Sequence, residues 1–270
     1  MAASSDGSTS EWEASLGTVS ARVVAVANQK GGVGKTTTAV NLAACLAEAG
    51  ERCLLVDLDP QANATSGLGR RANGHSTVDL LDGIPLRELV TPGPVANLEL
   101  VPAKAELAAT TVQLSALEGG ERYLADALGE EATAGYGFVF LDCPPSFGPL
   151  TVNALAAADR VVVPVQAEYY ALEGLSQLLG SIDLVKRRLN PRLGVAGILL
   201  TMVDARTRLA EQVERELRSH FGDLVFTTTV PRSVRLAEAP SHGLPAIAYD
   251  RRSAGAEAYW KVAMELVERT

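Results

Sequence analysis

The 270-residue sequence contains few of the features that mark exported or membrane-anchored proteins. It has only three cysteines, Cys45, Cys53 and Cys143, and their spacing fits neither a disulfide framework nor a metal-binding motif. No apolar run approaches the roughly 20 residues that a membrane-spanning helix needs. Residues 1–20 lack the basic start and the apolar core of a secretion signal. We therefore expect a cytoplasmic protein with no membrane partner, in which residues 1–20 form a flexible tail.

Basic side chains are scarce, and they are unevenly distributed. The formal net charge is −8 at pH 7, which alone argues against a nucleic-acid partner. Residues 1–180 contain 10 basic and 21 acidic side chains, a net of −11, whereas residues 181–270 contain 14 and 11, a net of +3. Such an asymmetry is often only a solvated face, so by itself it is a weak signal of binding.

Short apolar, β-branched segments alternate with helical patterns along residues 21–270, which we expect to form one domain. The expected helices cover residues 37–49, 167–189, 207–220 and 254–268, and residues 67–94 give no clear pattern. Apolar strands separated by amphipathic helices indicate an α/β, doubly wound fold, with a mostly parallel sheet and helices on both faces. The seven expected strands lie within residues 22–28, 53–59, 97–103, 136–145, 159–166, 193–203 and 223–230.

The first expected strand runs into the glycine-rich stretch "NQKGGVGKTTT", residues 28–38. A strand followed by such a turn and a helix presents backbone N–H groups and a positive helix end to an anion. Lys35 is expected to reach the β- and γ-phosphates, and the Thr36 hydroxyl to ligate Mg²⁺. Gln29 stands where the strict phosphate-loop motif has its first glycine. The expected nucleotide contacts are Lys30, Gly31, Gly32, Val33, Gly34, Lys35, Thr36 and Thr37.

Carboxylates follow two of the other expected strands. Asp142 ends "FVFLD", at the edge of the sheet where open α/β sheets bind ligands. Asp57 and Asp59 leave a second strand, and alternation of side chains allows only one of them to face the nucleotide from the strand itself. We expect Asp57 and Asp142 to hold Mg²⁺ together with Thr36. Because Cys143 stands where many nucleotide hydrolases carry a catalytic Glu, Asp59 is the candidate to orient water, and turnover should be slow.

Three blocks of sequence together resemble the ParA/Soj family of chromosome- and plasmid-partitioning ATPases, within the MinD/ParA superfamily. They are "KGGVGKTTTAVNLAACLAEAGERCLLVDLDPQANATSGLG", "FVFLDCPPSFGPLTVNAL" and "VPRSVRLAEAPSHGLPAIAYD", and the resemblance runs from about residue 22 to 268. The first block has the deviant Walker A form of that family. The resemblance implies ATP and Mg²⁺ as cofactors, with Lys30, Lys35 and Asp59 as the catalytic residues. It also implies an ATP-sandwiched homodimer, in which Lys30 reaches the partner's phosphates.

The resemblance further implies nonspecific binding of double-stranded DNA by the ATP-bound dimer. Arg206 and Arg235 match the family's DNA-contacting arginines, and Pro231 matches a segment that lies against the adenine. Hydrolysis would be stimulated by a ParB-type centromere-binding protein, and the ATP-bound protein would be associated with the nucleoid. By charge alone, further candidates for DNA contact are Lys186, Arg187, Arg188, Arg251 and Arg252. Nearby glutamates could instead neutralise any one of these arginines.

Three other functions stay open at this level. A MinD-like cell-division ATPase would attach to membrane through a basic amphipathic C-terminal helix, whereas residues 255–270 are net acidic. An ATP-dependent amide-forming synthetase of the same superfamily would need a further substrate pocket. An iron–sulfur reductase would need cysteine ligands at a dimer interface, a role that the positions of the three cysteines do not favour. Tyr169 and Tyr170 could contact the nucleotide or a partner, although such a pair more often packs in the core.

Overall fold

A computed structural model describes residues 20–168, 171–204 and 206–270. The expected tail at residues 1–20, apart from Ser20, and the Tyr169–Tyr170 pair lie outside the described residues. One seven-stranded sheet has the order β3-β4-β2-β5-β1-β6-β7, and all neighbouring strands are parallel except β3 and β4. The strands are β1 (Arg22–Val26), β2 (Cys53–Asp57), β3 (Thr91–Pro92), β4 (Leu98–Val101), β5 (Phe138–Asp142), β6 (Arg160–Gln166) and β7 (Gly194–Thr201).

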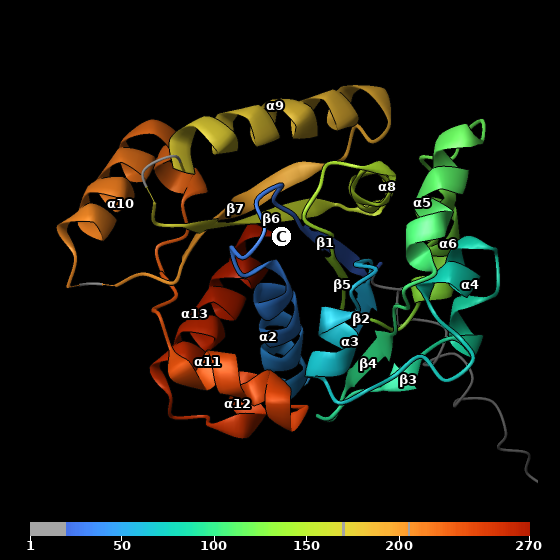
Figure 1. Ribbon diagram of the computed structural model, residues 1–270, viewed down its shortest axis with the longest axis horizontal. Coiled ribbons are helices and arrows are strands. Elements are labelled where there is room, and N and C mark those ends of the chain that lie inside the picture. The colour runs from blue at the N-terminus through green and yellow to red at the C-terminus, as the bar shows by residue number, and fades with distance from the viewer. Residues whose placement is uncertain (1–19, 169–170, 205) are drawn as a thin grey trace, which may run out of the picture.

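Helices cover both faces of this sheet, as Figure 1 shows. The longer ones are α2 (Lys35–Glu48), α5 (Leu107–Ala116), α8 (Pro149–Ala157), α9 (Ala171–Arg188), α10 (Arg208–Phe221) and α13 (Ala254–Arg269). The shorter ones are α3 (Asn63–Gly67), α4 (Thr77–Leu81), α6 (Tyr123–Ala127), α7 (Glu130–Thr133), α11 (Val234–Glu238) and α12 (Ala246–Tyr249). Single turns of 3-10 helix cover Leu86–Glu88, Gly222–Leu224 and Ala239–His242.

Alternating side chains of each strand divide the core into two layers. Val23 and Ala25 of β1 belong to the layer under α5, α8 and α9, while Val24 and Val26 belong to the layer under α2 and α13. Both sets are buried because the sheet is covered on both faces, which is why the central strands are apolar throughout. The predicted doubly wound α/β fold is confirmed, and the four predicted helices are each found within four residues of their predicted ends.

The seventh predicted strand, at residues 223–230, is wrong. A turn of 3-10 helix covers Gly222–Leu224. The following chain meets β7 through an isolated bridge between Val225 and Ile198 and through single hydrogen bonds from Phe226 N and Val230 N. Between these two bonds, the N–H groups of Thr227 and Thr228 and the carbonyl groups of Phe226 and Thr227 are bound by side chains of α10 and α13. The sheet has seven strands because of β3, which was not predicted. It is a two-residue antiparallel edge strand in the region that gave no clear pattern.

Candidate nucleotide-binding site

The glycine-rich loop leaves β1 at the carboxyl edge of the sheet and enters α2 at Lys35. Gly32 (φ 77°) and Gly34 (φ 88°) have left-handed backbone conformations that favour glycine. No side chain caps α2 and its first turn has no acidic residue, so its N-terminal N–H groups are available to an anion. Val33 is buried, and its carbonyl accepts a hydrogen bond from Thr201 Oγ1 at 2.8 Å. Its contribution to a ligand is therefore through its backbone.

The two lysines of the loop point in different directions. Lys35 is buried, and its Nζ donates to the Lys30 carbonyl oxygen at 2.9 Å. Burial lowers the pKa of Lys35, against the opposing effect of the Asp142 carboxylate. The Lys30 side chain is 55% exposed and forms an ion pair with Glu168, which follows β6. Lys35 therefore lines the cavity beside the loop, whereas the Lys30 side chain is exposed at the surface.

The two strand-end carboxylates lie side by side, because β2 and β5 are neighbours in register and pair Asp57 with Asp142. Asp57 is already bound by the protein. Its Oδ2 accepts hydrogen bonds from Thr65 N at 2.9 Å and Thr65 Oγ1 at 2.6 Å, and its Oδ1 accepts one from Asp59 N at 3.1 Å. Burial raises the pKa of Asp57 to about 6, although the bonds from Thr65 lower it. Three hydrogen bonds therefore hold the Asp57 carboxylate in place at the end of β2.

Asp142 differs from Asp57, because neither of its buried carboxylate oxygens has a hydrogen-bond partner among the residues that the structure describes. Burial and the neighbouring Asp57 carboxylate raise the pKa of Asp142 well above its ordinary value, while Thr36 and Lys35 act to lower it. A buried polar group without a partner indicates a missing ligand. Within the described residues no three His, Cys, Asp or Glu side chains form a metal cluster. A hydroxyl such as that of Thr36 and a carboxylate such as that of Asp142 suit Mg²⁺, which keeps several waters and takes few protein ligands.

A cavity of about 810 Å³ lies beside the loop. Of the predicted site residues, it is lined by Gly31, Gly32, Gly34, Lys35, Thr36, Thr37 and Asp59. Asp59 is 7% exposed and its Oδ1 accepts a hydrogen bond from Gln61 N at 2.9 Å. The rest of the cavity lining was not predicted from sequence, because no local motif marks it. It consists of Gln61, Asn63, Ser66, Gly67, Pro145, Met202, Pro240 and Ser241.

A second cavity of about 260 Å³ adjoins the first, with Gly34 and Thr37 contributing to both. Pro231 lines it, together with Val230, Arg232, Ser233, Leu236, Ala237 and Tyr259. The Tyr259 hydroxyl of α13 is hydrogen-bonded to Thr38 Oγ1 of α2 at 3.0 Å, which ties the C-terminal helix to the phosphate-loop helix. The segment at residues 230–233 therefore faces a largely apolar space beside the phosphate loop.

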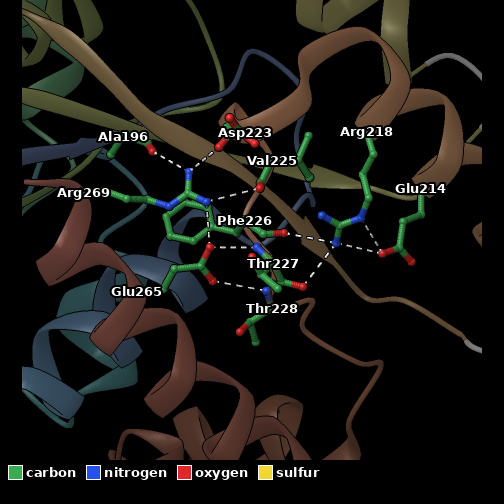
Figure 2. Close-up of polar contacts among 10 residues, drawn as sticks. All are labelled: Ala196, Glu214, Arg218, Asp223, Val225, Phe226, Thr227, Thr228, Glu265 and Arg269. Carbon is green, nitrogen blue, oxygen red and sulfur yellow. Dashed lines mark hydrogen bonds and ion pairs between the residues drawn. The ribbon is translucent and has the colours of Figure 1, made fainter.

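The segment before this second cavity is held by charged side chains, as Figure 2 shows. Glu265 accepts hydrogen bonds from the N–H groups of Thr227 (2.7 Å) and Thr228 (3.2 Å). Arg269 donates to Glu265 at 2.7 Å and to the carbonyl oxygens of Ala196, Asp223 and Val225. We call Glu265 and Arg269 the C-terminal clamp.

The two arginines predicted to touch DNA are exposed but paired. Arg206 binds Asp204 through two hydrogen bonds, of 2.9 Å and 2.8 Å. Arg235, on α11, forms ion pairs with Glu238 at 2.8 Å and with Asp250 at 3.3 Å. Helix α9, which carries Lys186, Arg187 and Arg188, covers the opposite face of the sheet from α11 (Figure 1). The basic candidates therefore do not form one continuous surface on a single chain.

The C-terminal helix and the three cysteines bear on the membrane-attached and iron–sulfur alternatives. Most of the apolar residues of α13 pack on the domain: Tyr259, Ala263 and Leu266 are buried, whereas Val267 is exposed. Within the described residues, no helix is both long and apolar enough to cross a bilayer. Cys45, Cys53 and Cys143 are all buried free thiols, and burial raises the pKa of Cys45 and of Cys53 to about 12. They are packing residues in this fold.

Comparison with known proteins gives a consistent result. A family model described as an AAA domain matches residues 21–195. The chain is 56% identical over 248 residues to the chromosome-partitioning ATPase Soj of Thermus thermophilus, covering 92% of this chain and 96% of that protein. It is 53% identical over 251 residues to the chromosome partitioning protein ParA of Myxococcus xanthus, with coverage of 92% and 88%. A solved structure, cobyrinic acid a,c-diamide synthase from Mycobacterium smegmatis with bound ATP analogue and magnesium, is 36% identical with a TM-score of 0.79, covering 92% and 95%.

Proposed function

The chain belongs to the ParA/Soj family of chromosome-partitioning ATPases, and from that premise we propose that it is an ATP-dependent switch for DNA partitioning. ATP and Mg²⁺ would join two subunits, and the dimer would bind DNA without sequence preference. A ParB-type partner would accelerate an otherwise slow hydrolysis and release the DNA. The observation that carries this proposal is the exposed position of Lys30, beside a buried Lys35. One lysine would serve the local phosphates, and the other would leave its ion pair with Glu168 to serve a second subunit.

Each site residue has a chemical task in this proposal. The backbone N–H groups of residues 31–36 and the Lys35 ammonium bind the phosphates, and Pro231 lies against the base. Thr36 and Asp142 would hold Mg²⁺, and Asp57 would support it from the neighbouring strand end. When bound, Mg²⁺ neutralises charge that develops on the transferred phosphoryl group. Asp59, at the cavity wall, orients the attacking water, and no stronger base stands in the Cys143 position. Slow turnover follows from this arrangement.

The amide-forming synthetase is the strongest rival, because three similar structures are of a cobyrinic acid a,c-diamide synthase. Its identity to this chain is 36%, against 56% and 53% for the two partitioning proteins. The described residues add no acid–base cluster beyond the nucleotide site, so no second chemistry is apparent among them. DNA binding separates the two functions directly.

The test is binding to a random-sequence duplex with ATP, with ADP and without nucleotide, over a series of salt concentrations. We expect binding only with ATP, weakening steeply with salt because arginines contact phosphates. Arg235→Ala should weaken binding at least about tenfold while dimerisation persists, because the dimer loses two phosphate contacts. Arg215→Ala, which removes an exposed i, i+4 ion pair with Glu211 on α10, is the matched control. Absence of DNA binding in every state would overturn the proposed function.

A further inference from the structure

The chain between Val225 and Val230 passes β7 without pairing to it as a strand. Phe226 N donates to the Ile198 carbonyl at 2.9 Å, and Val230 N donates to the Leu200 carbonyl at 2.8 Å. Between these two bonds, the N–H groups of Thr227 and Thr228 point to Glu265. A carboxylate thus replaces a neighbouring strand as the acceptor for two successive N–H groups. Charge-assisted bonds of this kind are stronger than those between neutral groups.

Arg269 supports the same segment from the other side. Its guanidinium lies 4.5 Å from the centroid of the Phe226 ring and donates to three backbone carbonyl oxygens. Phe226 is fully buried against Gly197 of β7, where a Cβ atom would come within 2.6 Å of the ring. From α10, Arg218 donates to the carbonyl oxygens of Phe226 and Thr227, each at 3.2 Å. Three charged side chains from two helices therefore fix one short stretch of backbone (Figure 2).

This stretch leads directly into the cavity beside the phosphate loop. Val230, two residues after Thr228, begins the segment that lines it, and Pro231 and Ser233 follow. Two backbone bonds hold that segment to Val203: Val203 N donates to Val230 at 3.0 Å, and Arg232 N donates to Val203 at 3.1 Å. The position of the cavity wall is thus set at one end by β7 and its extension, and at the other by the C-terminal clamp.

We propose that Glu265 and Arg269 are positioning residues for the base of the nucleotide, holding the 230–233 segment in its binding conformation. The proposal rests on the nucleotide site of the proposed function. Neither residue lines the cavity, so neither touches the ligand. If Glu265 is lost, two N–H groups lose their acceptor and the segment leaves its position part of the time. Nucleotide binding must then supply the free energy of ordering it, and the apparent affinity falls.

Two probes separate the two ends of the site: Mg·ATP, which has a base, and Mg·tripolyphosphate, which has none. For Glu265→Gln we expect about tenfold weaker ATP binding, since a charge-assisted bond to the backbone is lost. Tripolyphosphate affinity should stay unchanged, because the phosphate loop contacts neither clamp residue. Arg269→Lys, which keeps the charge but cannot donate in several directions, should lie between wild type and Glu265→Gln. Arg187→Ala removes an ion pair of the same i, i+4 spacing on α9 and should change neither affinity.

The results separate the possible failures. Equal loss of ATP and tripolyphosphate binding would mean a general structural role and would overturn the proposal, as would unchanged ATP binding in both clamp variants. If Glu265→Gln does not fold, Arg269→Lys and Glu265→Asp decide the matter by the same pair of probes. Wild-type protein that bound neither probe would count against the proposed function itself, whereas wild-type binding with unaffected variants counts only against the clamp.

Discussion

The two ends of the nucleotide site are built on different physical principles. At the phosphate end, a short loop supplies backbone N–H groups and one buried lysine, and two adjacent strand ends supply Asp57 and Asp142. At the base end, an irregular segment is held by the C-terminal clamp, whose residues come from the far end of the chain. The phosphate end has its geometry fixed by backbone conformation. The base end has its geometry fixed by side chains that bind backbone.

Because of this difference, substitutions at the two ends should affect the binding of different ligands. A change in the loop should affect every ligand that carries phosphates, with or without a base. A change in the clamp should affect only ligands that carry a base. A side-chain hydrogen bond between Tyr259 and Thr38 joins α13, which carries the clamp, to α2, which follows the loop. The following changes test this separation, from the largest expected effect to the smallest.

The largest effect is expected from Lys35→Ala. The variant should lose ATP and tripolyphosphate binding alike, by at least about a hundredfold, because a buried cation facing the phosphates is removed. Titration calorimetry with both ligands measures this. The ligand-free protein should keep its thermal stability, since burial already disfavours the Lys35 charge. If the variant kept its affinity for tripolyphosphate, Lys35 would not be the residue that binds the phosphates.

Asp142→Asn should separate metal binding from folding. Its two buried oxygens have no protein partner, so the carboxylate destabilises the magnesium-free protein. We expect the ligand-free variant to unfold at a higher temperature than wild type, while Mg²⁺ no longer improves ATP binding and hydrolysis falls at least about tenfold. Unfolding curves with and without Mg²⁺ check both parts. A variant that is less stable without ligand and normal with Mg·ATP would contradict this role for Asp142.

The smallest effect concerns the pH dependence of the clamp. Burial acts to raise the pKa of Glu265, but the bonds from Thr227, Thr228 and Arg269 outweigh it, and the pKa is lowered. A carboxyl whose pKa is lowered by folding stabilises the protein at pH values above its unfolded pKa, and this stabilisation is lost as pH falls through the folded pKa. The free energy of unfolding of wild type should therefore exceed that of Glu265→Gln by about 1–3 kcal/mol at pH 7. The difference should shrink below the ordinary pKa of 4.5.

Urea unfolding of both proteins from pH 7 down to pH 4 and below gives this difference directly. A gap that stays constant on acidification would show that the Glu265 charge is not what holds the segment. Arg187→Ala, whose ion pair with Asp183 is exposed on both sides, should show almost no gap at any pH. The control thus separates a partly buried clamp from an ordinary surface pair.

The same contrast explains what the sequence could predict. The glycine pattern of residues 31–34 predicts the phosphate loop, since each of its contacts is local. Asp57 and Asp142 were predicted to lie together, because parallel strands end at one edge. The sequence did not predict that Thr65 donates a hydrogen bond to Asp57, since no motif marks a threonine eight residues away. The clamp was missed because Glu265 contacts Thr227 across 38 residues, and β-branched composition at 223–230 suggested a strand.

The exposed position of Lys30 is central to the account, because the proposal assigns this side chain to the nucleotide site of a second subunit. The most direct measurement is the mass in solution of wild type and Lys30→Ala, both saturated with Mg²⁺ and a non-hydrolysable ATP analogue. We expect wild type to be dimeric, and Lys30→Ala to bind the analogue through Lys35 yet stay monomeric. If Lys30→Ala forms the dimer as readily as wild type, or if wild type stays monomeric, the coupling of nucleotide binding to dimerisation through Lys30 is contradicted.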